Sequence, residues 1–321
     1  MAGSVRLSSI VAKLEATSGT DSAPTSAADG VLYTVNNLKC SIEEKMVSRD
    51  VIRGVFGAAD MLPYTRRGNI TFSVELQSSN ALGTPPEWGD LLIGCGFAET
   101  ITAATRVEYT PSSSGLKTLT IWAYWNGKLE KFNFCAGTAK FNFKVGSLPT
   151  IDFAFQALVS SVTATPVVTS TVTAWKRALA VGAANTSAIL FGPTYSAGAF
   201  TGGTGYSWTD FQLDSGGDVQ DLEMAGTESV AVYNRQPSCN LVADIGAAGI
   251  VTQYANMHAG TPTTLGFTHG QTSGSKIMFF APNAVLTAID DQVNGNIMLN
   301  TANFALPPSA ALNDDFRIVV L

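Results

Sequence analysis

Hydrophobic and polar residues alternate over many short segments of the chain, which is typical of β-strands with one buried face. The clearest segment is NITFSVELQSS, residues 69–79, where every second residue is Ile, Phe, Val or Leu. The segments 117–137, 139–146 and 150–158 continue the alternation, and the first of them contains Asn126-Gly127, a strong signal for a two-residue hairpin turn. Up to about Leu158 the pattern therefore predicts one antiparallel β domain.

One segment, GTPPEWGDLLIGCGF, departs from this alternation. Its two prolines stand where a helix can begin, because proline has no amide hydrogen to lose at that position. Four apolar residues then follow at the i, i+3, i+4, i+7 spacing of one helix face: Trp88, Leu91, Leu92 and Cys95. The spacing predicts a helix of about three turns that ends near Gly96, and so short a helix is expected to cover one face of the sheet.

Residues 46–68, MVSRDVIRGVFGAADMLPYTRRG, are too many for a tight turn and too apolar for a disordered segment. Their charged residues are Arg49, Asp50, Arg53, Asp60, Arg66 and Arg67. Because long loops in compact domains are often functional, we expect a projecting loop that packs on a partner, with an ordinary surface loop as the alternative. Two adjacent arginines do not make a phosphate-binding track, so Arg66 and Arg67 are expected in ion pairs between subunits or at plain surface.

The Val-, Thr- and Ser-rich segment 159–175 suggests a linker or an extended edge segment, and we place a domain boundary there, between residues 1–165 and 166–321. The first domain begins with an N-terminal arm of small, polar residues. The second domain continues the pattern of short strands and Gly-rich turns, and no helix signal in it is as clear as that of residues 83–97. Two stretches recur in order: YTRRGNITFSVEL is similar to YNRQPSCNLVADI, and KFNFCAGTAKFNF is similar to KIMFFAPNAVLTA. A duplication whose second copy lost the helix region accounts for this likeness, and so does chance similarity between β-strands.

Charged residues make up only 14% of the chain, and the net charge is −6. Since affinity for nucleic acid comes from Lys and Arg, this composition argues against a protein that coats DNA, although a negative wall allows DNA to pass without being held. Neither a signal peptide nor the roughly 20 apolar residues of a membrane span is visible, so no membrane anchor is expected. The cysteines form no CxxC pair, and free buried thiols in a reducing cytosol are favoured over two disulfides.

Residues with catalytic or ligand-binding chemistry are sparse. The two histidines, His258 and His269, lie among Gly and Thr, and the chain has no nucleophile elbow, P-loop or zinc-ligand spacing. We therefore predict no enzyme, no metal site and no cofactor.

Two other groups of residues allow more than one interpretation. The segment TDFQLDSGGDVQDLE gathers Asp210, Asp214, Asp218 and Asp221. A solvated turn is favoured there over a calcium loop, and an acidic patch facing a lumen is the third alternative. Aromatic residues 122, 124 and 125 could form a sugar-binding strip, but core and hairpin packing is favoured because aromatic residues are common in strands.

The order of these motifs resembles that of the tail tube proteins of long-tailed, siphovirus-type bacteriophages. The likeness includes NALGTPPEWGDLLIGCGFAET, the VEYTPSSSGLKTLTIWAYWNGKLEKFNFCAG that follows it, and IVAKLEATSGTDSAPTSAADGVLYTVNNL near the start. SVAVYNRQPSCNLVADI and SGSKIMFFAPNAVL resemble the second half of longer family members. The likeness covers most of the chain and is loosest between residues 190 and 222.

This resemblance implies two tandem antiparallel β-sandwich or barrel domains and a structural, non-enzymatic role. Rings of the protein would stack into a non-contractile tail tube around an electronegative lumen, through which genomic DNA passes during ejection. If the halves are duplicates, three chains make a pseudo-hexameric ring, which we favour; otherwise six chains form it and the second halves decorate the outside.

The resemblance also implies partners and a location. The expected partners are other copies of the chain, the tape measure protein, the tail terminator and baseplate or distal tail proteins, with DNA passing transiently. The expected location is the virion tail, after synthesis in the host bacterial cytoplasm. A virion decoration protein or a receptor-binding β-sandwich is the alternative function.

Overall fold

The computed structural model describes residues 6–35, 37–294 and 297–321, and within them the protein is mainly β, as the alternation predicted. The helices of this described part are α1 (Gly89–Ile93) and α2 (Gly246–Ala259). The strands of the first half are β1 (Ser8–Leu14), β2 (Gly30–Val31), β3 (Lys39–Arg49), β4 (Asp60–Glu75), β5 (Phe97–Thr102), β6 (Arg106–Pro111), β7 (Leu119–Trp125), β8 (Lys128–Lys144) and β9 (Thr150–Ala164). Those of the second half are β10 (Ile189–Phe191), β11 (Thr194–Ser196), β12 (Ala199–Thr201), β13 (Thr204–Asp214), β14 (Gly217–Met224), β15 (Thr227–Arg235), β16 (Ser238–Asp244), β17 (Thr263–His269), β18 (Ile277–Asn294), β19 (Ile297–Ala305) and β20 (Arg317–Val320).

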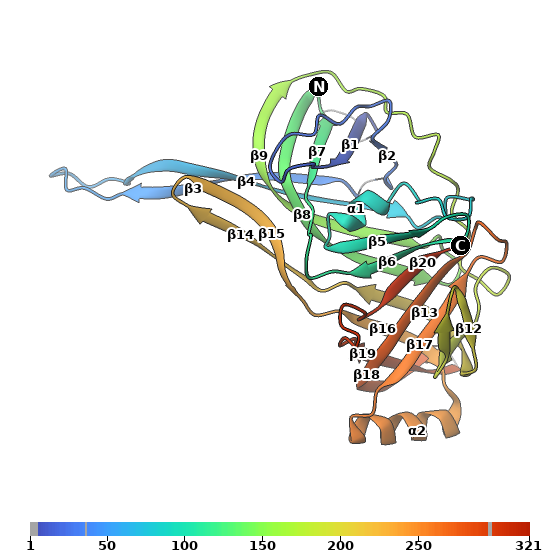
Figure 1. The fold of residues 1–321 in the computed structure, drawn as a ribbon. Helices are drawn as coiled ribbons and strands as arrows, with labels where there is room; N and C mark the ends of the chain where they lie inside the picture. The colour runs from blue at the N-terminus through green and yellow to red at the C-terminus, as the bar shows by residue number, and fades with distance from the viewer. Residues whose placement is uncertain (1–5, 36, 295–296) are drawn as a thin grey trace.

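Eight strands form a continuous antiparallel sheet, here called the inner sheet, that crosses both halves of the chain (Figure 1). Its order is β3-β4-β9-β8-β13-β16-β19-β18. The halves join where β8 pairs with β13, from Lys140 opposite Asp214 to Lys144 opposite Asp210. Because side chains alternate across a strand, one face of this sheet is apolar and buried, and the other, the polar face, is not.

Further pairings curl each half of the chain into a barrel. In the first half β7 and β1 continue from β8, β2 pairs with β1, and a bridge from Tyr33 to Val74 returns to β4. In the second half β17 continues from β18, and β10 connects β17 back to β13. The predicted N-terminal arm thus supplies β1 of the first barrel, while its first five residues lie outside the described part. The barrels also meet through β20, which pairs with β18 on one side and β6 on the other.

Aromatic side chains from both halves fill one shared core. Phe143 of β8 packs edge-on against Phe267 of β17, with ring centroids 5.1 Å apart, and it also contacts Phe211 of β13. Such edge-to-face pairs add to the free energy gained from burying the rings. The two barrels are therefore joined by side-chain packing as well as by sheet pairing.

Helix α1 covers the first barrel, with Trp88, Leu91, Leu92 and Cys95 all buried. The Trp88 indole N–H donates a hydrogen bond to the Gln77 carbonyl oxygen at 2.7 Å. The helix has five residues rather than the predicted three turns, because the flanking residues form turns. Gly94 lies so close to Leu119 that a Cβ there would stand 2.4 Å from the leucine, and Gly96 turns the chain with a φ of +83°.

The prediction that the second half has no comparable helix was wrong, because α2 has 14 residues. Its sequence, GAAGIVTQYANMHA, begins without a side-chain cap and has few apolar residues at helical spacing, which hid it from pattern analysis. Gly260 ends it in the left-handed conformation, at φ 63°. Since α2 follows β16 as α1 follows β4, the helix region expected to be lost from the second half is occupied by a helix.

The segment 46–68 was expected to be a loop, but most of it belongs to the long hairpin of β3 and β4, whose register runs from Lys39 opposite Thr71 to Arg49 opposite Asp60. A second hairpin, β14 with β15, extends from β13 and β16. Both project from the same side of the molecule (Figure 1). Cross-strand hydrogen bonds along each hairpin explain how such long segments remain extended away from the core.

Candidate assembly surfaces

The first candidate surface is the hairpin tip, defined as residues 46–62 at the end of β3 and β4. Ile52 and Phe56 are fully exposed, with relative accessibilities of 102% and 109%, and Val47, Val55, Met61 and Leu62 are each more than half exposed. An apolar patch of this kind on a soluble protein marks a site of protein–protein contact or a membrane contact. The tip is therefore a candidate surface for contact with another molecule.

The charged residues predicted in this segment fall into two groups. Arg49 and Arg53 both form ion pairs with Asp60 near the tip, and Asp50 begins the connection after β3. Farther down the hairpin, Arg66 pairs with Glu44 of β3 in an exposed contact. Exposed pairs of this type contribute about 0–1 kcal/mol, so they hold local geometry more than they stabilise the protein.

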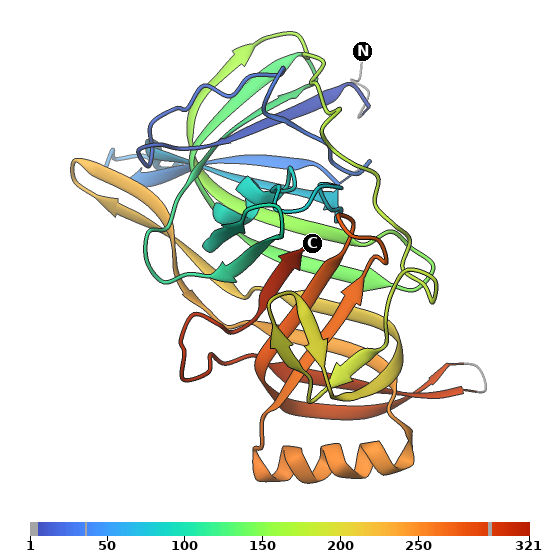
Figure 2. The same ribbon diagram turned by 45° about the vertical axis from the view of Figure 1, so that its right-hand side comes forward.

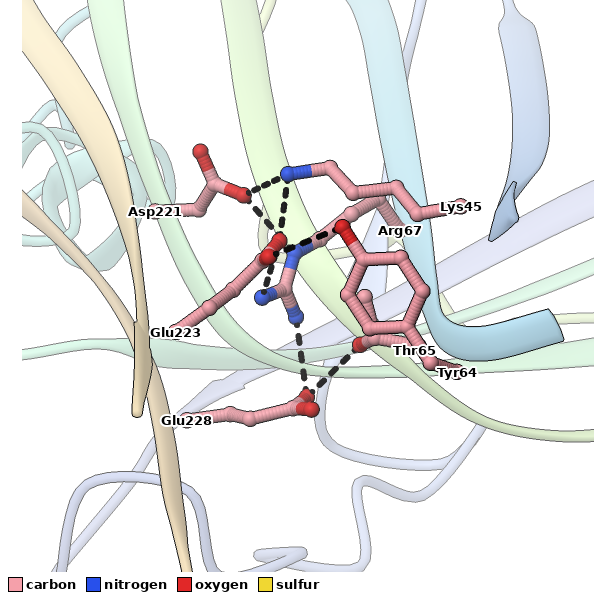
Figure 3. Close-up of polar contacts among 7 residues, drawn as sticks. All are labelled: Lys45, Tyr64, Thr65, Arg67, Asp221, Glu223 and Glu228. Atoms are coloured by element: carbon pink, nitrogen blue, oxygen red, sulfur yellow. Dashed lines mark hydrogen bonds and ion pairs between the residues drawn. The ribbon is translucent and has the colours of Figure 1, made fainter. Parts of the chain in front are cut away.

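Arg67 makes a different set of contacts, which we call the hairpin clamp (Figure 3). Its guanidinium lies 3.0 Å from Asp221, 3.0 Å from Glu223 and 3.1 Å from Glu228, all on the β14–β15 hairpin. Lys45 of β3 pairs with the same Asp221, at 2.5 Å, and with Glu223. Two cations on one hairpin and three carboxylates on the other thus bind the two projections to each other.

Neighbouring polar groups complete the hairpin clamp. The Thr65 hydroxyl donates a hydrogen bond to Glu228 at 2.8 Å, and the Tyr64 hydroxyl donates one to Glu223 at 3.3 Å. The Arg67 side chain is only 8% exposed, whereas its carboxylate partners are 25–37% exposed. Such a shielded guanidinium depends on all three acceptors, because burying an unpaired charge is costly.

The clamp shifts the pKa values of its members in opposite directions. Hydrogen bonds from Lys45 and Arg67 hold the pKa of Asp221 well below its usual range, although partial burial acts the other way. Hydrogen bonds to Asp221 and Glu223 raise the pKa of Lys45. Burial lowers the pKa of Arg67, but its carboxylates outweigh this effect and the net shift is upward. All three groups are therefore charged over the whole neutral range.

The predicted acidic cluster is divided among these features. Asp221 belongs to the hairpin clamp, and Asp218 is exposed on β14. Asp210 and Asp214 lie in β13 on the polar face, opposite Lys144 and Lys140 of β8. Burial raises the pKa of Asp210, and Lys144 opposes that shift. The favoured solvated turn is wrong for most of this segment, because two strands occupy it.

The polar face carries a row of side-chain amides that the motif search missed. Asn142 donates to Asp152 at 2.8 Å, and Gln212 donates to Asn142 at 2.7 Å, which links three neighbouring strands across the junction of the two halves. Farther along the sheet, Asn240 donates to Asn303 at 2.6 Å. The signal in the sequence was a polar residue at every second position of these strands.

Two edges of the inner sheet remain open. Among the described residues, β3 pairs only with β4, and the distal part of β18, from Val285 onward, pairs only with β19. Open edges present unpaired backbone groups that can pair with another chain. These edges lie at opposite ends of the inner sheet, as a head-to-tail contact between copies requires.

The other candidate residues have structural surroundings. All four cysteines are free, and burial raises the pKa of the Cys95 thiol. His269 is buried, its Nδ1 lies 2.9 Å from the Thr186 hydroxyl, and burial lowers its pKa, while His258 is exposed on α2. Lys131 stacks over the ring of Trp122 at 3.5 Å. Within the described ranges no group of three or more His, Cys, Asp or Glu side chains is arranged to hold a metal ion.

No helix in the part of the chain that the structure describes is long and apolar enough to cross a membrane. A family model described as phage tail tube protein matches residues 6–308, nearly the whole chain. None of the curated proteins compared with the chain matches it.

Proposed function

The chain belongs to the phage tail tube protein family, a family of structural virion proteins, and on this premise we propose that three copies form a ring and that rings stack into the tail tube. The observation that supports this proposal best is the repeated strand order of the inner sheet. β3-β4-β9-β8 in the first half corresponds to β13-β16-β19-β18 in the second. In each set two antiparallel strand pairs meet through the later strand of each pair, β4 with β9 and β16 with β19.

The chain order supports duplication as well, with residues 1–165 and 166–321 as its two units. β4 is followed by α1, β7, β8 and β9, and β16 is followed by α2, β17, β18 and β19. The first unit differs by the insertion of β5 and β6 after its helix. Each chain thus supplies two tube units, so three chains make a pseudo-hexameric ring.

The ring closes through the open edges of the inner sheet. Inside the chain, β8 of the first unit pairs with β13 of the second. Between chains, the equivalent strands are β18 of one copy and β3 of the next. Pairing there removes both edges and continues the inner sheet around a lumen lined by the polar face.

The polar face suits a lumen through which DNA passes without being held. From β4 to β16 its ionisable side chains outside the clamp are mainly acidic: Glu75, Asp152, Asp210, Asp214 and Asp244 against Lys140 and Lys144. An acidic surface repels the phosphate backbone, and hydrogen-bonded amides offer it few free donors. No catalytic step and no cofactor belongs to this function.

Rings stack through the hairpin tip, which would insert its apolar residues into the neighbouring ring. Further partners follow from a tube with two ends: a tape measure protein inside it during assembly, a tail terminator, and baseplate or distal tail proteins. The protein is made in the host cytoplasm and functions in the virion tail of a siphovirus-type phage, where the tube conducts the genome during ejection.

Cryo-electron microscopy of the purified protein at high concentration tests this proposal. Hollow tubes with three chains per ring and sixfold pseudo-symmetry are expected. Six chains per ring would keep the tube and overturn the duplication. Discrete particles, even with virion lysate added as a nucleus, would overturn the tube and favour a decoration or receptor-binding protein. Deleting Val51 to Met61 should leave folded subunits that do not stack.

A further inference from the structure

Helix α2 presents an uncharged face to solvent. Its 14 residues include no Asp, Glu, Lys or Arg, and one side of it packs Ile250 and Met257 on the second barrel. On the flank next to this packed side Val251 is 67% exposed and Tyr254 is 44% exposed. We call this flank the α2 face, defined by Ala247, Val251, Tyr254 and His258. A helix face without charge is unusual on a solvated surface and is typical of an interface.

An apolar groove lies at the other end of the molecule. It has a volume of about 370 Å³, and its apolar lining consists of Leu7, Val31, Leu32, Val35, Val167, Val168 and Val172. These residues lie just before β1, at the end of β2 and after it, and in the segment that follows β9. Both views place α2 at one end of the molecule and these segments at the opposite end (Figures 1 and 2). A head-to-tail neighbour would therefore bring an α2 face toward a groove.

The junction between the two units of one chain shows how such a neighbour would sit. That junction has an inner layer, β8 with β13, and a further layer, β6 with β20. β6 belongs to the segment between β4 and β7, and β20 to the segment that follows β19. At a junction between two copies, the segment equivalent to β6 is α2, between β16 and β17. The segment equivalent to β20 is residues 165–175, which follow β9 and line part of the groove.

We propose that the α2 face of one copy docks in the apolar groove of the next copy in the ring, where it forms a second layer outside the pairing of β18 with β3. This inference rests on the proposed function and names the partner surface for each end of the chain. It also explains why the two units differ after their helices. Unit one uses β5 and β6 to meet its own second unit, whereas unit two uses α2 to meet another molecule.

Cysteine cross-linking between two variants tests this contact. Val251→Cys is prepared in one batch and Leu32→Cys in another, and the two are mixed under assembly conditions before mild oxidation. Because the native cysteines are buried or half-buried, each variant alone serves as the control. A covalent dimer that forms only in the mixture, and only when rings or tubes are present, is expected. Tubes without this dimer would overturn the docking and leave the proposed function standing.

A charge placed on the α2 face gives an independent measurement. Tyr254→Lys should raise the critical concentration for assembly at least about tenfold, the effect of losing one well-buried aromatic contact. Thr252→Lys adds the same charge on the other flank of the helix and should change it less than about twofold, as expected for a site outside the contact. Equal effects of the two substitutions would refute the inference, and wild-type protein that forms no rings would refute the proposed function together with it.

Discussion

Removing the apolar side chains of the hairpin tip should abolish stacking without destabilising the subunit. Ile52 and Phe56 are fully exposed in the isolated chain, so replacing both with Ser removes no packing from the core. Burying one such side chain at an interface is worth about 2 kcal/mol. In the proposed ring of three copies, losing only Phe56 should weaken one ring-on-ring contact by about 6 kcal/mol, which is roughly a ten-thousandfold decrease in the association constant.

Light scattering against protein concentration, followed by electron microscopy, measures this effect. Phe56→Ser should give rings or monomers at concentrations where wild-type protein gives tubes, and its thermal unfolding should match the wild type. Leu312→Ser is the matched control, because Leu312 is also more than half exposed but lies far from the tip in the sequence. Tubes formed by Phe56→Ser at the wild-type critical concentration would refute the assignment of the tip to stacking.

Three further predictions concern the hairpin clamp and the polar face. Arg67→Met leaves three carboxylates without their shared cation and should lower the free energy of unfolding by about 1–3 kcal/mol in denaturant titrations, whereas Arg66→Met, which breaks only an exposed pair, should change it by less than about 0.5 kcal/mol. Because folding lowers the pKa of Asp221, its ion pairs stabilise the folded protein above the ordinary carboxyl pKa, about pH 4, and this stabilisation is lost as the pH falls further toward the lowered pKa. Wild type and Asp221→Asn should therefore converge in stability under acid conditions. A constant difference down to pH 2 would contradict the pairing. Phage whose tube protein carries Asp210→Lys and Asp214→Lys should eject DNA more slowly at low salt than wild type, with the difference shrinking at high salt; equal rates at low salt would contradict a lumen lined by the polar face.

The strands of the core could be predicted from the sequence because each has one buried face. Over residues 69–75 of β4 and 150–157 of β9 the buried apolar residues stand at every second position, and the Asn126-Gly127 turn fixes one hairpin directly. The helices were harder, since glycines around α1 shorten it and α2 lacks both charge and a capping side chain. Patterns of apolar residues along the sequence thus located the elements that bury a whole face in the core. They did not predict the bounds of an element that contacts the core with only a few residues.

The hairpin clamp was beyond prediction for a different reason. Lys45 and Arg67 meet Asp221 and Glu223 across more than 150 residues of sequence, so each group looked like a separate surface cluster. Only the register of β3 with β4 and of β14 with β15 brings the charges together. The acidic segment was noted in the sequence as a solvated turn, but its partners depend on how two hairpins cross in space.

The differences between the two units bear on the symmetry of the tube. The β3–β4 hairpin ends in an apolar tip that no described residue covers, whereas the β14–β15 hairpin places Glu223 and Glu228 in the clamp beside it. If both hairpins stacked alike, the second would need an equivalent tip, yet its connection is the short turn after Met224. We therefore expect the second hairpin to brace the first. In the proposed ring of three copies, contacts between rings should then follow threefold symmetry while the lumen approaches sixfold symmetry. Maps of the tube that show six equivalent hairpin contacts between rings would contradict this division of roles.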